Sequence, residues 1–426
     1  MTVSSPCRGP ALPDLPPRHR ESTQWLAPAR QELGDLVREL HDSSRSWLPA
    51  GLGSRLGWGP PVGTDTVVSC RQLDRILEHN PEDFTIAVEA GTPLVAVQEE
   101  LHRHGQWLAL DPPWGSAQGS IGGLVARGLA GGYRQRHLGV RDQLIGLHVL
   151  RADGVGAKAG GRVVKNVAGY DLMRLFCGSW GSLGLITAVH LRTQPLPPRR
   201  RGLRAAGEAA ALAELARTVL GSTLAPERID WWSAPLAAAA GLEPELQLQL
   251  GLASVDEAAL DDQIATLRAR TDLPITVLAA ETLEHLQEFG RGLEGTAADG
   301  SDSPWLLRLG VDPAAVDRLL LSSEAEGLAI EIGAGSGLGM AWCLPGAPGE
   351  APRPAQVAAL RRRCAELGGF LTVLKQPPGG TLPAWEDAPS RPLIEAVKRE
   401  FDPRLQLAPG RLPGVASPRP QANATV

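Results

Sequence analysis

Two glycine-rich segments carry the residues whose types and spacing point most directly to chemistry. The first, LPAGLGSRLGWGPP, covers residues 48–61 and contains Gly51, Gly53, Gly57 and Gly59. Glycine lets a backbone turn tightly and approach a ligand with no Cβ in the way. Consecutive N–H groups in such a turn form a concave anion site suited to a pyrophosphate, and the Ser54 hydroxyl adds a donor.

This segment does not fit a Rossmann dinucleotide loop. A Rossmann loop must open a helix whose N-terminus faces the phosphates. Here Pro60 and Pro61 follow Gly59 at once, and two prolines in the first turns would break that helix. A nucleotide loop of another kind and an ordinary glycine-rich surface turn both stay open from this segment alone.

The second segment, DPPWGSAQGSIGGLVARGLAGG, covers residues 111–132. Ser120–Gly123 offers a run of N–H donors and leads into a small-residue helix, LVARGLAGG. The small residues Gly123, Ala126 and Gly131 let the chain lie against a flat ligand, although a helix packed tightly on a sheet needs them too. Two such segments about 60 residues apart favour a nucleotide site over two ordinary turns.

A third segment, residues 161–195, combines another close-approach turn with a strand. Gly178, Gly181 and Gly184 directly precede the strand-like LITAVHLR. Asp171 is expected to N-cap a short helix that runs through Phe176.

The elements that position these segments follow from the hydrophobic pattern. We predict an amphipathic helix over 30–41, a helix over 71–80, and a helix over 94–105 opened by Thr92 as N-cap and Pro93 as first residue. We predict strands over 66–70, 84–91, 143–154, 183–198, 246–252 and 305–310.

The domain organisation is read from shifts in composition. Residues 1–21 and 415–426 are predicted to be tails, and the proline- and arginine-rich 195–204 marks a boundary. Residues 22–195 then form one domain and 196–400 a smaller α+β cap domain. Residues 401–414 form a closing segment that returns to the first domain.

Composition excludes several classes of function. The net charge is −5, with no long basic run, which argues against nucleic acid as a partner. No transmembrane segment or secretory signal is expected. The five cysteines form no C-x-x-C pair, so we predict no iron–sulfur cluster, no metal site and a reducing cytoplasm.

Together the three segments resemble the FAD-binding domain of the p-cresol methylhydroxylase (PCMH) and vanillyl-alcohol oxidase superfamily. The residues that carry the resemblance are P-x-G-x-G-S, then P-x(7)-S-I-G-G-x-x-A, then KNVAGYDLMRLFCGSWGSLGLIT. The implied fold is α+β, a PCMH-type FAD-binding domain of two α+β subdomains followed by the smaller cap domain. The finer resemblance, which includes DPPWG and the terminal FDP…PGR, is to FAD-binding subunits of glycolate oxidase or dehydrogenase (GlcE type).

The resemblance implies FAD and the residues that would contact it. These are Pro49, Ala50, Gly51, Leu52, Gly53, Ser54, Arg55, Pro112, Gly115, Ser120, Ile121, Gly122, Gly123, Ala126, Asn166, Gly181, Gly184 and Ile186. Family members with covalent flavin carry a His or Cys linker, and the first loop has neither, so we expect non-covalent FAD. Ala408 stands where many relatives have an Asn, so a polar contact from that side chain is lost.

Other candidates near these segments have a structural alternative. Arg134 and Arg136 either face the flavin or form a solvated pair. Lys165 and Asn166 either face the cofactor or form a structural turn. We interpret Cys177 as a packing residue and His137 as a surface residue.

The histidines bear on mechanism. Oxidation of a 2-hydroxy acid needs a hydride acceptor, a cation for the carboxylate and a base for the hydroxyl proton. Catalytic subunits of the superfamily carry a histidine cluster in the C-terminal domain, whereas the last histidine here is His285. The resemblance therefore implies a complex with a catalytic flavin subunit and an iron–sulfur subunit. The complex would lie in the cytoplasm, or at the inner membrane to which its partners attach it. It would pass electrons to a quinone-linked acceptor. A stand-alone D-2-hydroxy-acid dehydrogenase and a flavin-less scaffold are the alternatives.

Overall fold

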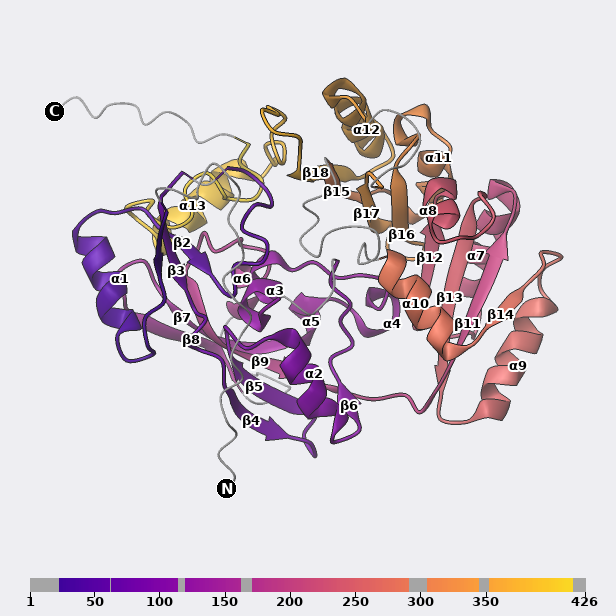
Figure 1. The fold of residues 1–426 in the computed structure, drawn as a ribbon, viewed down its shortest axis with the longest axis horizontal. Helices are drawn as coiled ribbons and strands as arrows, with labels where there is room; N and C mark the ends of the chain where they lie inside the picture. Colours follow the sequence, from indigo (N-terminus) through magenta and orange to yellow (C-terminus); the bar gives the residue numbers. More distant parts are fainter. Residues whose placement is uncertain are drawn as a thin grey trace.

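The computed structural model describes residues 23–61, 63–113, 119–161, 171–290, 305–344 and 352–416. The protein is mixed α+β, as predicted. Figure 1 shows one set of strands in the first half of the chain and a separate, larger sheet in the second half. The predicted tail 1–21 and the predicted site residues Gly115 and Asn166, with Lys165, lie outside the described residues.

The N-terminal region (residues 23–195) contains three sheets among its described residues. One is parallel, in the order β1-β3-β2, and one is antiparallel, in the order β4-β5-β9-β7-β8; β6 and β10 form a small antiparallel pair. The strands are β1 (Gln24–Leu26), β2 (Leu48–Ala50), β3 (Thr66–Ser69), β4 (Ile76–Asn80), β5 (Thr85–Glu89), β6 (Gln106–Trp107), β7 (Leu144–Leu150), β8 (Gly156–Gly160), β9 (Leu185–Arg192) and β10 (Gln194–Pro195).

Short helices pack around these sheets. They are α1 (Leu33–Asp42), α2 (Leu94–His102), α3 (Ile121–Arg127), α4 (Arg134–His137), α5 (Val140–Gln143) and α6 (Met173–Phe176). In α1, Leu33, Val37 and Leu40 recur at helical spacing and are buried, so this face joins the core formed by β5, β7 and β9.

The C-terminal region (residues 199–375) is built on one antiparallel sheet in the order β14-β11-β13-β12-β16-β17-β15-β18. Its strands are β11 (Arg199–Ala206), β12 (Arg228–Trp232), β13 (Gln247–Ser254), β14 (Thr276–Leu278), β15 (Leu306–Gly310), β16 (Ala329–Gly333), β17 (Leu338–Trp342) and β18 (Phe370–Lys375). Its helices are α7 (Ala209–Leu220), α8 (Ala234–Ala239), α9 (Glu257–Arg268), α10 (Ala280–Gly290), α11 (Val316–Leu320) and α12 (Pro354–Glu366), with 3-10 turns at Pro313–Ala315 and Ser323–Ala325.

The two faces of this sheet have different neighbours. Successive side chains of a strand alternate between faces, so in β15 Leu307 and Leu309 join the core under α7, α9, α11 and α12. Leu306 faces the other way and packs in a cluster with Trp58 of the N-terminal region. The second face of the large sheet therefore closes against the N-terminal region.

The chain then returns to its first half through α13 (Arg391–Phe401) and the non-regular residues that follow, a stretch we call the return segment (residues 391–416). The Phe401 ring at the end of α13 packs edge-on against Phe176 of α6, with ring centroids 5.4 Å apart. Leu407 pairs with Trp47 in an isolated parallel bridge, and Gln406 Nε2 donates to the carbonyl of Leu40 at 3.0 Å. The return segment thus packs on the first elements of the chain.

Most predicted elements of the N-terminal region are present, but the prediction of a helix over residues 71–80 is wrong. Residues 76–80 form β4, which pairs with β5 in antiparallel register, His79 opposite Ile86. Ile76 and Leu77 are exposed rather than buried on a helical face. The backbone partners that β5 offers outweigh the local helical spacing.

Three helix starts also differ from the predictions. Pro93, not Thr92, is the N-cap of α2, because the Thr92 hydroxyl donates to the carbonyl of Arg75 at 3.3 Å. The N-cap of α6 is Leu172, while Asp171 makes an ion pair with Arg174. The small-residue helix begins earlier than expected, at Ile121, and ends at Gly128 in the left-handed conformation.

No helix in the described residues is long and apolar enough to cross a membrane.

Candidate functional site

The first glycine-rich loop leaves β2 and lies directly against the second. A Cβ added to Gly51 would lie 1.9 Å from the Ser120 Oγ, so only glycine permits this contact. Gly53 follows with a φ of +80°, where a side chain is strained. The Ser69 hydroxyl donates to the Gly51 carbonyl at 2.7 Å and holds the turn to β3.

The second loop enters α3 through a well-formed cap. Ser120 is the N-cap, and its Oγ accepts from the Gly123 amide at 3.2 Å. Gly122 packs against Ala90, the residue that follows β5, because a Cβ on Gly122 would lie 2.7 Å from that of Ala90. Two of the glycines predicted to approach a ligand therefore also let protein segments pack closely.

The third glycine-rich segment lies against the end of α3 and forms the remaining side of the site. Trp180 and Gly181 both have positive φ, +56° and +75°. The Trp180 amide donates to the carbonyl of Ala126 at 2.8 Å, which fixes the turn to the end of α3. Gly184 and Ile186 continue into β9.

The three segments surround a cleft of about 1040 Å³, open solvent at its mouth included. We call it the nucleotide cleft. The predicted residues that line it are Pro49, Ala50, Gly51, Leu52, Gly53, Ser54, Arg55, Pro112, Ser120, Gly122, Gly123, Ala126, Gly181, Gly184 and Ile186. Ile121 does not line it, because its side chain is fully buried in the core of the N-terminal region. Contact of these residues with a cofactor stays a prediction.

Arginines dominate the charge of the nucleotide cleft. Arg55, Arg127 and Arg411 line it, whereas no acidic residue does among the described lining residues. Arg55 and Arg127 lie over the Trp58 ring at 5.5 and 5.4 Å from its centroid. Burial, with Arg55 and Arg411 nearby, holds the pKa of Arg127 well below its usual range. A cleft lined by several arginines favours an anion such as a diphosphate.

The arrangement fits FAD on three counts. The surface of the cleft is mainly apolar and includes a few polar groups. Its cations can offset a diphosphate, and its glycines expose backbone on the first loop. Cys70 is the thiol among the described lining residues, and burial raises its pKa to about 12, so it is a poor nucleophile for attaching a flavin.

A second cleft adjoins the first and shares Arg127 and Trp180 with it. We call it the arginine cleft, because Arg127, Arg134, Arg141, Arg308 and Arg361 line it, with Glu386 and Asp387 as its described acidic residues. Burial, then Arg134, lowers the pKa of Arg308. Arg361 donates to the carbonyls of Leu371 and Pro383 and so holds backbone.

The other candidate residues named from the sequence lie in different parts of the structure. Arg134 borders the arginine cleft, whereas Arg136 is exposed, so they do not act as a pair. Cys177 packs against the core of the N-terminal region, as predicted. The prediction of His137 as a surface residue is wrong: its ring packs edge-on against Trp107 at 5.6 Å and its Nε2 lies 3.5 Å from Glu227 Oε1. Ala408 is buried beside Leu48 with a φ of +45°.

Sequence reasoning missed Arg127, Arg411, Trp58 and Trp180 as lining residues. Arg411 belongs to the PGR of the closing motif, which supported the resemblance, but no cofactor contact was predicted for this arginine. Arg127 offered no signal, because an arginine at the end of a short helix is typical of a solvated surface.

A buried ion network joins the two regions beside these clefts. Arg228 of β12 contacts Asp230 at 2.6 Å, Glu331 of β16 at 2.7 Å and Asp111, next to Pro112, at 3.4 Å. All four side chains are almost fully buried. Asp111 also accepts from the Gly131 amide at 3.1 Å, so the network fixes both ends of the second loop against the large sheet.

Part of the chain is similar to known proteins. Residues 27–159 match the family described as FAD binding domain. Glycolate oxidase subunit GlcE of Escherichia coli (strain K12) is 38% identical over 175 residues, which are 41% of this chain and 49% of that protein. Glycolate oxidase subunit GlcD of Bacillus subtilis (strain 168) is 31% identical over 191 residues, 44% of this chain and 40% of that protein. A probable mitochondrial D-lactate dehydrogenase of Danio rerio is 32% identical over 173 residues, 39% and 34% of the two chains.

The matched stretches span half or less of each of these relatives. At the level of fold, the chain resembles alkyldihydroxyacetonephosphate synthase in two crystal forms, with TM-scores of 0.63 and 0.62. These alignments cover 90% of this chain and about three quarters of that one, at 15% and 14% identity.

Proposed function

We propose that this chain binds FAD without a covalent bond and is the FAD-carrying subunit of a glycolate (2-hydroxy acid) oxidase or dehydrogenase complex. One observation carries the proposal: the nucleotide cleft is lined by three glycine-dense segments and three arginines, and no acidic residue is among its described lining residues. The cleft lies largely within the part of the chain that matches an FAD binding domain.

The residues present suggest how the cofactor would be held. The loop from Pro49 to Arg55 supplies backbone amides, and Arg127 and Arg411 supply charge for the diphosphate. Leu52, Leu94 and Ile186 supply apolar surface. When bound, FAD supplies a two-electron acceptor for a C–H bond next to a hydroxyl.

The arginine cleft supports a carboxylate as the other ligand. Arg308 and Arg134 lie together in it, and their mutual repulsion is relieved when an anion binds. Glycolate and other 2-hydroxy acids carry such a carboxylate. The shared residues Arg127 and Trp180 place this cleft next to the nucleotide cleft.

A role as one subunit is supported by the relatives and by the lining residues. Two of the relatives are named as glycolate oxidase subunits. No histidine is among the described residues that line either cleft, so the proton-accepting histidines of hydroxy-acid oxidation would come from a catalytic flavin subunit. An iron–sulfur subunit would take the electrons onward.

The test is to purify the chain alone and together with its native partners, and to count flavin and iron in each preparation. We expect one dissociable FAD per chain, and additional flavin and iron in the complex. We also expect glycolate and D-lactate to be oxidised, with an artificial acceptor, by the complex and not by the isolated chain. A colourless chain that takes up no FAD would overturn the proposal and leave a scaffold role.

A stand-alone D-2-hydroxy-acid dehydrogenase is the second candidate, because a carboxylate bound in the arginine cleft is equally compatible with a chain that oxidises the acid by itself. If it is correct, the isolated yellow chain turns over D-lactate or glycolate rapidly. Arg308→Met would then raise KM strongly, because the carboxylate loses a cation.

A further inference from the structure

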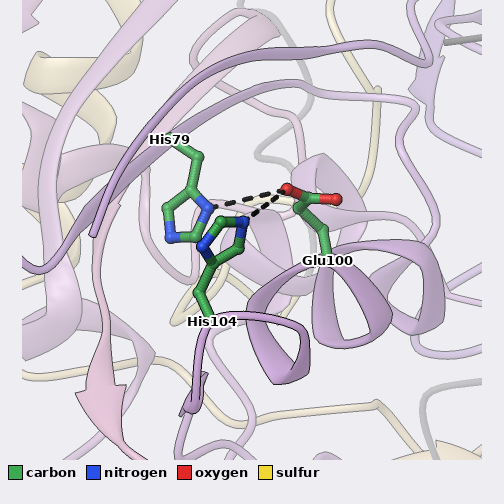
Figure 2. Close-up of side chains that lie close together, drawn as sticks. All are labelled: His79, Glu100 and His104. Atoms are coloured by element: carbon green, nitrogen blue, oxygen red, sulfur yellow. Dashed lines mark ion pairs between the residues drawn. The ribbon is translucent and has the colours of Figure 1, made fainter.

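Three metal-ligating side chains meet away from both clefts, on the edge of the sheet that contains β4 (Figure 2). His79 comes from β4, Glu100 from α2 and His104 from the turn after α2. Glu100 Oε1 lies 3.7 Å from His79 Nδ1 and 3.4 Å from His104 Nε2. The three ligand atoms lie within 4.8 Å of one another, and none of these residues lines the nucleotide cleft or the arginine cleft.

The tautomer of the His79 ring follows from its other neighbour, Gln106. Gln106 Nε2 donates to the carbonyl of Pro81 at 2.7 Å, so Gln106 Oε1 is an acceptor, and it also accepts from Thr193 at 2.7 Å. His79 Nε2 lies 3.3 Å from this oxygen and must donate to it. In the neutral ring the lone pair is then on Nδ1, which points at the Glu100 carboxylate (Figure 2).

Two acceptors therefore face each other. The His79 side chain is 7% exposed, and its Nδ1 is buried without a hydrogen-bond partner. A lone pair beside a carboxylate is unfavourable unless a positive charge lies between them. Either a proton or a metal ion can supply that charge. Arg103 contacts the other carboxylate oxygen, Oε2, at 2.8 Å and leaves Oε1 directed at the two histidines.

We propose that His79 Nδ1, Glu100 Oε1 and His104 Nε2 bind a divalent transition-metal ion, with Zn²⁺ as the best fit. Two imidazoles and one carboxylate form a donor set that suits Zn²⁺ and excludes Ca²⁺ and Mg²⁺, which require mainly oxygen ligands. Bond lengths of about 2.0–2.2 Å place tetrahedral ligands roughly 3.3–3.6 Å apart, close to the two distances to Glu100. Gln106 orients the His79 ring as an outer hydrogen-bond partner does in zinc sites.

The site is partly open and joins two elements. His104 is 45% exposed and Glu100 25%, so water completes the fourth position. The ion links β4 to the C-terminal end of α2, whose first residue, Leu94, is hydrogen-bonded to Gly119 at the nucleotide cleft. The role that follows is structural: the metal fixes the far end of a helix that borders the cofactor.

The test uses the flavin-loaded protein after dialysis against a chelator. Zn²⁺ is titrated by calorimetry, and Co²⁺ by its visible absorption bands. We expect one ion per chain, a tetrahedral Co²⁺ spectrum, and a higher Tm with Zn²⁺. His104→Ala and Glu100→Gln should weaken Zn²⁺ binding by more than the roughly 10–100-fold caused by losing a residue that only orients a ligand.

His102→Ala is the matched control, because His102 is an exposed histidine of the same helix and is outside the cluster. It should bind Zn²⁺ as the wild type does. Absence of stoichiometric binding, or equal binding by His104→Ala, would overturn the proposal and leave a proton-linked ion pair. Since His104 is half exposed, circular dichroism and flavin content of His104→Ala should match the wild type.

Discussion

At the scale of single residues, Arg127 is unusual because the charged residues near it in the nucleotide cleft are also arginines. Arg55 and Arg411 share its cleft, and no described acidic residue lines that cleft with them. Charge-assisted hydrogen bonds contribute about 1.5–3 kcal/mol each. We expect Arg127→Met to weaken FAD binding by roughly 10–100-fold, measured by fluorescence titration of the flavin-free protein.

The flavin-free Arg127→Met protein should be no less stable than the flavin-free wild type, because repulsion among the three arginines is relieved. Arg136→Met, an exposed arginine of α4, should leave FAD affinity unchanged. Wild-type affinity in Arg127→Met would contradict the assignment of Arg127 to the diphosphate end.

Glu331 gives a prediction about pH. One arginine, Arg228, faces three buried carboxylates, and burial raises the pKa of Glu331 from 4.5 to about 7. Between these values the folded state holds a proton that the unfolded state has lost, so the free energy of unfolding falls as pH rises through this window. Glu331→Gln keeps the shape and removes the titration.

We therefore expect Glu331→Gln to have a higher thermal midpoint than the wild type above pH 7, and a flatter dependence between pH 5 and pH 8. Thermal unfolding at both pH values checks this. Glu326→Gln, an exposed glutamate of the same region, should follow the wild-type curve. Parallel curves for Glu331→Gln and wild type would refute the raised pKa.

At the scale of elements, the two glycine-rich loops depend on each other. A Cβ on Gly51 would meet the Ser120 hydroxyl, the N-cap of α3. Gly51→Ala should destabilise the protein by about 1–3 kcal/mol, through overpacking and loss of the cap, and should reduce the flavin content. Urea unfolding and absorbance of the purified protein measure both.

Gly161→Ala is the control, because a Cβ there meets no atom of the described residues within 4 Å. It should change neither stability nor flavin content appreciably. If Gly51→Ala binds flavin normally and unfolds at the wild-type midpoint, the contact between the loops is more adaptable than its geometry indicates.

The elements also show what the sequence could predict. Strands β5, β7 and β9 were predicted correctly because they are buried on both faces, which gives continuous apolar runs. Strand β4 was not, because its conformation is decided by pairing with β5 and not by its own residues. Because residues 71–80 were predicted to form a helix, there was no reason to expect His79 beside His104. The cluster of His79, Glu100 and His104 was therefore not predicted.

In the nucleotide cleft, too, features decided by the local sequence could be predicted and features decided by tertiary contacts could not. Its glycines were predicted because close backbone approach requires that residue type locally. Arg127 and Arg411 come together only through the fold, from α3 and the return segment, and no local pattern relates them. The division into domains and the cofactor contacts stay predictions.

At the scale of the whole molecule, the return segment depends on one buried ion pair. Lys398 Nζ contacts Asp402 at 2.5 Å and donates to the carbonyls of Ser182 and Leu407. Removing one partner of a buried pair typically costs about 3–5 kcal/mol. We expect Asp402→Ala to lose stability of this order in urea unfolding and to bind FAD more weakly, because Arg411 is then held less firmly.

Glu400→Ala, an exposed site on the same helix, should have little effect. The stability of Asp402→Asn should fall between those of Asp402→Ala and Glu400→Ala. The single amide oxygen of asparagine can still accept from the Gln406 amide, whereas the Leu407 amide loses its acceptor. A midpoint for Asp402→Ala equal to that of Glu400→Ala would show that the pair contributes little.

The return segment also has a consequence for biosynthesis. A ribosome delivers the chain from its first residue, yet Arg411 and the Leu407 bridge to Trp47 are among the last described contacts to emerge. The intervening large sheet is therefore synthesised before the half that contains the nucleotide cleft is finished. A nascent chain halted before residue 391 should be unable to retain flavin, because it lacks Arg411 and the Leu407 bridge. Cofactor loading should therefore follow synthesis of the return segment.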